Sequence, residues 1–305
     1  MADNSEDRSV LATVTAAYGR RMELELNDGR RVAARTRRRR LRVVCGDRVT
    51  AVSQSGDDDW IIDAIEPRCS ELARTDSRGR REILVANLTA LIVVAAPRPK
   101  PDWYMIDRMV GTAFLLGLRP ILVFNKSDLV ASDDAVLTEY AALPIERFTT
   151  NALSGDGLAS LARRLRTEVA ALLGQSGVGK SSLLNALVPS ASEATGAMNE
   201  STDEGRHTTV AARQIQLPKG GRIIDAPGVR DFAPHIESMA RVAVAFPEIL
   251  AASAACRFTD CTHRSEPACA VRAGVDAGTI AERRYASYRR LFVITDQLIN
   301  KRQPH

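Results

Sequence analysis

The tetrapeptide Asn125-Lys126-Ser127-Asp128 (NKSD) precedes the octapeptide GQSGVGKS at Gly174–Ser181, and a third motif, DAPG, follows at Asp225–Gly228. The octapeptide fits G-x-x-x-x-G-K-[ST], the pattern of a loop that cradles nucleotide phosphates. In ordinary GTP-binding domains this loop comes first in the chain. Because NKSD comes first here, the sequence predicts an α/β domain of the P-loop GTPase class whose chain order is circularly permuted.

Asp128 has the side chain needed to recognise guanine. Its two carboxylate oxygens match the ring N–H and the exocyclic amine of guanine, whereas adenine offers no such pair of donors. A site of this kind rejects the wrong base strongly, because its own polar group would be left unpaired. We therefore expect Asn125, Lys126 and Asp128 to bind the base end of GTP, and Asp128 argues against a P-loop kinase or ATPase.

The phosphate loop has the sequence context that its motif requires. An apolar run at residues 168–173 is expected to form the preceding strand, and Ser182–Leu187 the following helix. Glycines let the backbone N–H groups face phosphate oxygens, while Lys180 reaches the β- and γ-phosphates and Ser181 ligates Mg²⁺. The other predicted GTP-binding residues here are Gly174, Gln175, Ser176, Gly177, Val178, Gly179 and Ser182. A chance glycine-rich turn that opens a helix is the alternative, and the two further motifs disfavour it.

The DAPG motif is predicted to face the γ-phosphate. Asp225 ends the run at residues 222–225, so it is expected at the end of a strand, where it holds Mg²⁺ through water. Gly228 would offer its backbone N–H to the γ-phosphate. Many GTPases place a water-orienting glutamine after this glycine, but the residue here is Val229, which cannot orient water. Another residue must therefore position the nucleophile.

The segment GRHTT at residues 205–209 is the nearest candidate for that task. His207 is expected to orient the attacking water, and Thr208 or Thr209 to complete the Mg²⁺ shell. The predicted catalytic residues are thus His207, Lys180 and Thr209. The alternative for His207 is an ordinary surface or packing role.

Three cysteines and a histidine crowd into the stretch 256–269. Cys256, Cys261, His263 and Cys269 supply three thiolates and an imidazole, the ligand set of a closed tetrahedral zinc site. A catalytic zinc would keep an open position, so the predicted metal is structural. The alternative is three cysteines buried close together by chance, which their polar, turn-forming neighbours argue against. The remaining two, Cys45 and Cys69, are predicted to be buried.

The chain is predicted to divide into residues 1–68, 69–234 and 235–305. In the first region, strands are expected at residues 10–16, 21–26, 31–35, 41–45 leading into 49–53, and 60–65. Five strands in so short a region indicate a small barrel, preferably an OB-fold, although alternation alone does not exclude an SH3-like barrel.

The second and third regions are predicted from apolar runs and helix signals. Strands at residues 88–95 and 121–125 enclose a helix that begins after Asp102 and ends near Gly117, as a parallel sheet requires. The third region carries helices around the cysteine cluster, the last spanning about residues 277–300. The second region is therefore expected to be the GTPase domain and the third a helical zinc-binding domain.

Arginines cluster on or beside a loop of the predicted barrel, at Arg35, Arg37, Arg38, Arg39, Arg40 and Arg42. Such a run is often only a solvated charged segment. On a barrel of a fold that commonly binds oligonucleotides, it predicts contact with nucleic-acid phosphates rather than reading of bases.

Composition predicts a cytoplasmic protein without a membrane partner. The 305 residues carry a net charge of +5, and no apolar run approaches the length of a membrane helix. The first ten residues are acidic and polar, unlike a signal or transit peptide. Five cysteines, an odd number, favour a reducing compartment over a disulfide framework.

Together these motifs resemble the RsgA family (also called YjeQ), circularly permuted GTPases that act late in assembly of the small ribosomal subunit. The resemblance covers nearly the whole chain and rests on GDRV at 46–49, NKSD at 125–128, GQSGVGKSSL at 174–183, GRHTT at 205–209, DAPGVRDF at 225–232 and the cysteine cluster. It implies an OB-fold, a permuted GTPase domain and a zinc-binding domain. It also implies that the small ribosomal subunit and its rRNA are partners, that the subunit stimulates turnover, and that the histidine matching His207 positions the catalytic water.

The implied cofactors are one structural Zn²⁺, and Mg²⁺ bound with GTP; we expect a monomer that binds GTP and GDP. One departure concerns the loop near the guanine, which usually reads Ser-Ala in the family and is Asn151-Ala152 here. The backbone N–H of Ala152 is still expected to meet the guanine oxygen. A second function stays open: a GTP-gated rRNA-binding module whose hydrolysis is incidental.

Overall fold

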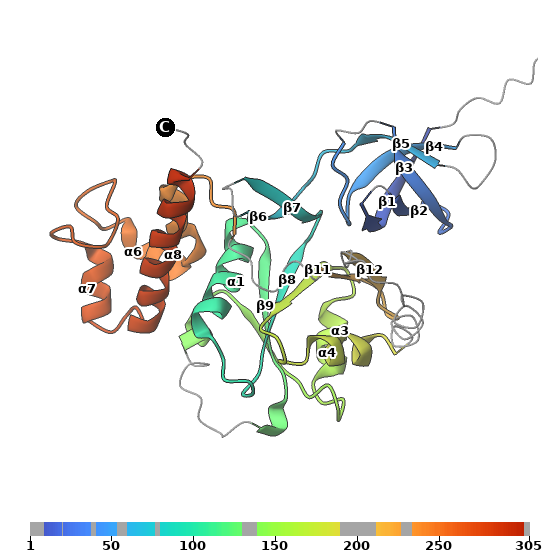
Figure 1. Cartoon of the computed structure of the whole chain (residues 1–305). Coiled ribbons are helices and arrows are strands. Elements are labelled where there is room, and N and C mark those ends of the chain that lie inside the picture. Colours follow the sequence, from blue (N-terminus) through green and yellow to red (C-terminus); the bar gives the residue numbers. More distant parts are fainter. Residues whose placement is uncertain are drawn as a thin grey trace, which may run out of the picture.

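The computed structural model of the chain describes residues 9–19, 21–37, 41–53, 60–76, 80–129, 139–189, 212–226 and 234–301. Figure 1 shows a β-barrel and a helical region at opposite ends of the molecule, with a mixed α/β domain between them. Among the described residues, no helix is long and apolar enough to cross a membrane.

The barrel contains β1 (Ser9–Tyr18), β2 (Arg21–Leu26), β3 (Arg31–Thr36), β4 (Arg48–Ser53) and β5 (Trp60–Ile65). The strands pair in the order β1-β2-β3-β5-β4 and β4 returns to β1, with β3 and β5 parallel and the other pairs antiparallel. This closed five-stranded order is that of an OB-fold, which decides between the two barrels that the sequence left open. Alternate residues of β2, Met22, Leu24 and Leu26, are buried in the barrel core.

The strand predicted at residues 41–45 is wrong. Residues 41–44 form no strand, and Cys45 makes only an isolated bridge to Val85 of the neighbouring domain. The reason is a local side-chain contact, because the Val44 N–H donates to Asp47 Oδ2 at 2.8 Å instead of to a neighbouring strand. Asp47 is itself held by Arg68, whose Nε lies 2.6 Å from Asp47 Oδ1.

The central sheet has the order β10-β9-β8-β11-β13-β12. Its strands are β8 (Ala90–Ala95), β9 (Arg119–Phe124), β10 (Glu146–Thr149), β11 (Val169–Gly174), β12 (Arg213–Gln216) and β13 (Arg222–Asp225). The first five in this order are parallel and β12 is antiparallel. One apolar core lies between the sheet and α1 (Trp103–Leu115), and another between the sheet and the helices α3 (Leu158–Arg164) and α4 (Lys180–Leu187).

Helix α1 begins and ends as its sequence predicts. The Asp102 side chain caps the helix by accepting from the Met105 N–H at 3.1 Å. Gly117, with φ +67°, follows the last turn. The predicted strands 88–95 and 121–125 are confirmed as β8 and β9 with shifted ends.

A two-stranded hairpin, β6 (Glu71–Thr75) with β7 (Arg81–Ala86), connects the barrel to the central sheet and was not predicted. Gly46 of the barrel packs directly on it, since a Cβ there would lie 2.1 Å from Ala86 O. Cys45 is buried at this junction, as predicted. The prediction of burial was wrong for Cys69, which is exposed in the connection after β5, where its N–H is bonded to Asn87 Oδ1.

The C-terminal region contains η4 (Met239–Ala245), α6 (Pro247–Ser253), α7 (Ala270–Asp276) and α8 (Glu282–Asn300) around its own core. The last helix begins later than predicted, because Ala277 and Gly278 (φ +72°) terminate α7. Two single turns, η1 (Ser127–Leu129) and η2 (Tyr140–Ala142), follow β9 and precede β10. The domain boundaries at residues 68 and 234 stay predictions.

Candidate nucleotide site and metal centre

The sequence motifs meet at the carboxyl edge of the parallel strands. NKSD follows β9, the phosphate loop starts at the last residue of β11, and Asp225 ends β13. In open α/β sheets this edge is where ligands bind. The structure therefore brings together all the described members of the predicted GTP site.

Asn125 joins the base motif to the phosphate loop. This buried side chain donates from Nδ2 to Val178 O at 3.1 Å, and its Oδ1 accepts from Thr150 Oγ1 and from the Ala152 N–H, both at 3.2 Å. One amide thus fixes three loops relative to one another. The Ala152 N–H, which we expected to meet the guanine oxygen, is already bonded to Asn125, so a bound guanine would have to share this donor.

Two positions of the phosphate loop accept only glycine, because any side chain there would clash with neighbouring atoms. Gly174 has φ +147°, and a Cβ there would lie 2.4 Å from Val94 O of the adjacent strand. Gly179 has φ +94°, and a Cβ there would lie 2.4 Å from Asn125 Nδ2. Both contacts are far closer than non-bonded atoms allow, so larger side chains would displace the loop. Helix α4 begins directly after Gly179, and its N-terminus faces this edge.

Two lysine side chains hold the phosphate loop by bonding its backbone carbonyls. Lys126 Nζ donates to Gly177 O at 2.7 Å and to Arg98 O at 3.0 Å. Lys180 Nζ donates to Gly174 O and Gln175 O, both at 2.7 Å. Both ammonium groups therefore lie at the loop where an anionic ligand would bind. Arg98 was not singled out from the sequence, because it contributes a backbone carbonyl and no motif marks it.

The remaining predicted residues fall into two groups. Ser181, Ser182 and Asp225 are exposed at the carboxyl edge, and Asp128 is exposed on η1. His207, Thr208, Thr209 and Gly228 lie outside the described residues, as do Val229 and Arg38–Arg40. Asn151, the departure from the family pattern, is buried and donates from Nδ2 to Asp128 Oδ1 at 3.0 Å.

The predicted metal ligands meet in space. The ligand atoms of Cys256, Cys261, His263 and Cys269 all lie within 4.8 Å of one another. His263 Nδ1 is 3.5 Å from Cys256 Sγ and 3.6 Å from Cys269 Sγ, and these two sulfurs are 3.9 Å apart. A tetrahedral zinc with usual bond lengths needs edges of about 3.6 Å between N and S and about 3.8 Å between two sulfurs. The cluster fits that ion.

Neighbouring residues hold this cluster in shape. Glu266 accepts from the Thr262 N–H at 2.7 Å, from the Arg264 N–H at 2.9 Å and from the Ser265 N–H at 3.1 Å. Burial alone would raise the pKa of Glu266, but hydrogen bonds from the Thr262 hydroxyl and from the backbone N–H groups of Glu266, Thr262 and Ser265 hold that pKa well below its usual range. Burial lowers the pKa of His263, which favours the neutral imidazole that a metal requires.

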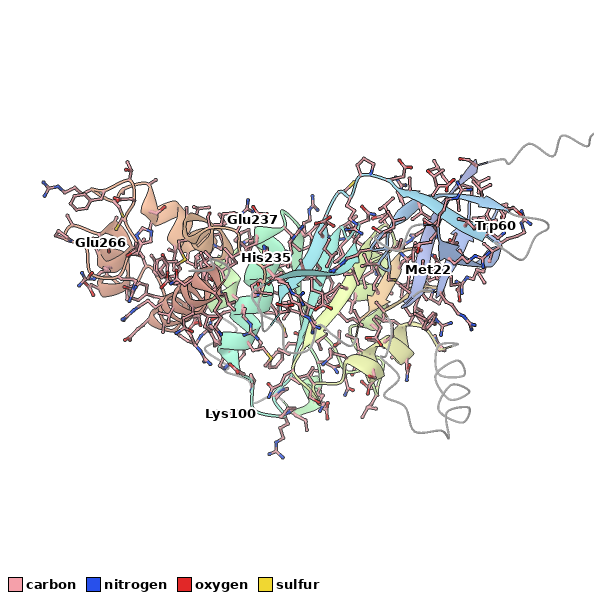
Figure 2. The ribbon with its side chains drawn as sticks, turned by 45° about the horizontal axis from the view of Figure 1, so that its top comes forward. Met22, Trp60, Lys100, His235, Glu237 and Glu266 are labelled. Atoms are coloured by element: carbon pink, nitrogen blue, oxygen red, sulfur yellow. The ribbon has the colours of Figure 1, made fainter. Side chains whose placement is uncertain are left out.

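Helix α8 secures the same loop from the other side. Tyr285 OH donates to His263 O at 2.5 Å, and Tyr288 OH donates to Thr262 O at 3.0 Å. Figure 2 places Glu266, within this loop, at the far end of the molecule from Met22 and Trp60 of the barrel. The cluster of three cysteines and a histidine is therefore remote from the barrel.

A base motif that precedes the phosphate loop, with both at one edge of a parallel sheet, defines a circularly permuted GTPase. The family described as RsgA GTPase matches residues 65–234. Small ribosomal subunit biogenesis GTPase RsgA of Azotobacter vinelandii is 40% identical over 91% of this chain and 83% of its own length. The same-named protein of Shewanella oneidensis is 33% identical over 99% and 88%. The chain belongs to the RsgA GTPase family.

Solved structures agree with this fold over nearly the whole chain. YjeQ from Thermotoga maritima is 27% identical and superposes with a TM-score of 0.75, covering 94% of this chain and 99% of its own. YloQ, described as a circularly permuted GTPase, is similar in fold, with a TM-score of 0.73 over both full chains. The predicted order of domain types is thereby confirmed.

Proposed function

We propose that this chain hydrolyses GTP at the carboxyl edge of its central sheet during maturation of the small ribosomal subunit. The observation that carries the proposal is the junction at Asn125, which holds the base motif and the phosphate loop in one site. Asp128 reads guanine, Lys126 packs along the base, and Ala152 offers its N–H to the guanine oxygen. Lys180 leaves its two loop carbonyls to bind the phosphates.

Mg²⁺ fits the oxygen-bearing residues at this edge. Ser181 and Asp225 would hold it together with Thr208 or Thr209, and the ion would neutralise charge on the β- and γ-phosphates. Ser181 and Asp225 are both exposed: Ser181 lies in the first turn of α4, which follows β11, and Asp225 ends the adjacent strand β13. Gly228 contributes a backbone N–H, and His207 orients the attacking water because Val229 cannot.

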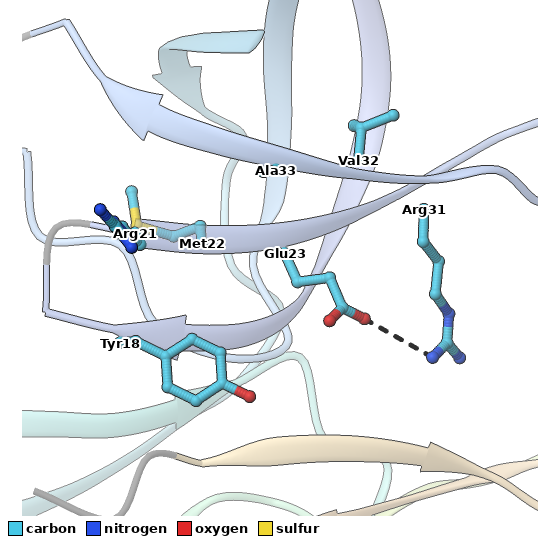
Figure 3. A pocket seen from close by; sticks show the side chains of 7 residues that line it. All are labelled: Tyr18, Arg21, Met22, Glu23, Arg31, Val32 and Ala33. Carbon is cyan, nitrogen blue, oxygen red and sulfur yellow. Dashed lines mark ion pairs between the residues drawn. The ribbon is translucent and has the colours of Figure 1, made fainter. Parts of the chain in front are cut away.

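The ribosomal part of the proposal rests on relatives and on the barrel. The relatives above are named as small ribosomal subunit biogenesis GTPases. Figure 3 shows a hollow on the barrel lined by Tyr18, Arg21 and Arg31, among others. An adjacent hollow is lined by Arg35 and Arg37. We assign this face to rRNA phosphates, with Arg38–Arg40 and Arg42 as further contacts, in a cytoplasmic monomer.

Subunit-stimulated hydrolysis tests this function. Purified small subunits are expected to raise the GTP turnover of the full chain, and His207→Ala to remove most of that rise while GDP affinity stays nearly unchanged. The reason is that positioning of water carries much of the rate in phosphoryl transfer. Lys180→Ala is the contrasting variant, because it should weaken nucleotide binding itself. A turnover rate that is the same with and without small subunits would favour the second candidate, an rRNA-binding module gated by GTP.

The salt dependence of subunit binding tests the arginine face. Replacing Arg37–Arg40 by glutamine should weaken binding and reduce the slope of log K against log salt by about 0.7–0.9 for each phosphate that the barrel no longer neutralises. Basal hydrolysis should hardly change. Arg30→Gln is the matched control, because Arg30 is an exposed arginine on the same barrel with Asp28 as its partner. An unchanged slope would make the run an ordinary solvated segment.

We further assign a structural Zn²⁺ to the Cys₃His cluster. Cys261→Ser should release the ion and loosen the C-terminal region, because the energy of structural zinc binding is folding energy. GDP affinity should survive, since the nucleotide site has a separate core. Metal analysis with GDP titration measures both, and Cys69→Ser, at an exposed lone cysteine, is the control. Freshly purified wild type without stoichiometric zinc would refute the assignment.

A further inference from the structure

We propose that Asn151 positions the carboxylate of Asp128 and thereby sets how strongly this site selects guanine. The inference rests on the proposed reading of guanine by Asp128. Nothing in the motifs assigns a role to Asn151, which differs from the serine usual at this place in the family. Its role follows from the contacts that its two amide ends make.

Both the oxygen and the nitrogen of the Asn151 side-chain amide are hydrogen-bonded. Oδ1 accepts from the Leu153 N–H at 2.9 Å and from the Ser154 N–H at 3.3 Å, which closes the turn after β10. Nδ2 donates to Asp128 Oδ1 at 3.0 Å. Turning the amide over would set an oxygen against the carboxylate and an NH₂ group against two N–H donors. The turn therefore fixes which end of the amide faces Asp128.

The loop around Asn151 is rigidly built. Its own N–H donates to Asp156 O at 3.0 Å, and its carbonyl accepts from the Gly155 N–H at 2.9 Å. Gly157 follows with φ +72°, and a Cβ there would lie 2.1 Å from Thr149 O. Asn151 is 9% exposed. The backbone of this loop therefore prevents the Asn151 side chain from rotating freely and keeps its Nδ2 donor facing Asp128.

Asp128 needs such a partner. It lies exposed on the single turn η1, which begins directly after Lys126, whose φ is +59°. Among the described residues, Asn151 provides the hydrogen bond that restrains this carboxylate. The terminal torsion of an aspartate is broad, so an unrestrained carboxylate would rarely present both oxygens to the two guanine donors. Each carboxylate oxygen has two acceptor positions, so Oδ1 can serve Asn151 and guanine together.

The variant Asn151→Asp distinguishes two roles of the side chain: positioning the Asp128 carboxylate and closing the turn after β10. Aspartate keeps the shape of the side chain and an oxygen for the Leu153 and Ser154 N–H groups, but it replaces the donor by a second carboxylate. Asn151→Ala removes both functions, and Asn151→Ser restores a hydroxyl donor. Ser154→Ala changes the same exposed loop without touching Asp128 and is the control.

The measurement is calorimetric titration of the full chain, with Mg²⁺, using GDP and IDP, which lacks the 2-amino group of guanine. In Asn151→Asp, GDP affinity should fall roughly 10- to 100-fold, as expected for losing a partly buried hydrogen bond to a charged group. IDP should lose less, so the ratio of the two dissociation constants should move toward one. GDP affinity should recover as the pH is lowered, because a proton shared between the two carboxylates restores a donor. Asn151→Ser should recover most of the ratio.

Three outcomes bear on the proposal. A wild-type ratio in Asn151→Asp and Asn151→Ala, with unchanged melting temperatures, would overturn it. Equal losses for GDP and IDP together with a lower melting temperature in Asn151→Ser would also overturn it, because the residue would then act on the loop alone. A wild type that does not prefer GDP to ADP would instead overturn the proposed reading of guanine by Asp128.

Discussion

Asp107→Ala is expected to lower the free energy of unfolding by about 3–5 kcal/mol, the usual result of breaking a buried ion pair from one side. The Asp107 side chain is fully buried on α1 and accepts from Arg283 Nη1 at 2.7 Å and from Arg284 Nη1 at 2.8 Å. It also accepts from Tyr140 OH at 2.5 Å. Three donors from two other parts of the chain therefore depend on one carboxylate.

The charge left behind explains the size of the effect. Arg284 is 1% exposed, and its Nε also bonds Glu248 at 2.7 Å. Burial alone would lower the pKa of Arg284, but Asp107 and Glu248 raise it above its ordinary value, so this guanidinium stays charged. Without Asp107, the positive charge of Arg284 would be only partly balanced in the protein interior, by Glu248.

Urea unfolding of the full chain measures this loss. In the double variant with Arg284→Met the cost should be well below the sum of the two single costs, because the second change removes the unpaired charge. A loss of about 0.5 kcal/mol or less in Asp107→Ala, the range of ordinary surface changes, would contradict the expectation.

The second large effect concerns the base. Asp128→Asn is expected to weaken GDP binding roughly 10³-fold or more, because an amide donor would face the donors of guanine and leave them unpaired. The phosphate loop should be unaffected, since Gly174 and Gly179 are fixed by β8 and Asn125 and not by Asp128.

Xanthine nucleotides provide the matched test. Xanthine carries a carbonyl where guanine has its amine, so the amide of the variant can donate to it, and XDP should bind the variant far better than GDP does. Titration of wild type and variant with GDP, XDP and ADP measures this change of preference from guanine to xanthine. A variant that still prefers GDP to XDP as wild type does would exclude Asp128 as the base reader.

Local signals in the sequence were sufficient for much of the fold. The alternation in β2 and the cap at Asp102 each act on their immediate neighbours, and the strand and the helix start predicted from them are confirmed. The zinc-ligand cluster is confirmed as a spatial group for the same reason, since its spacing is short.

Long-range contacts explain what the sequence did not reveal. The strand predicted at residues 41–45 is prevented by the contact of Val44 with Asp47, and Asp47 is held in turn by Arg68, 21 residues further along the chain, which no local pattern connects. Asp107 and Arg284 meet across 177 residues of chain. Asn151 looked like a simple departure from a family motif until its contact with Asp128 was seen. The role of His207 stays a prediction, because that residue lies outside the described part of the chain.

The pairing of β1 with β12 has a mechanical consequence. Ala16 of the barrel is in register with Arg213, the first residue of β12, and β12 continues into β13, which ends at Asp225. A second attachment lies at Gly46 and β7. Two anchors fix the orientation of the barrel as well as its position, so a change in the angle of β12 would act on the barrel against the contact between Gly46 and β7.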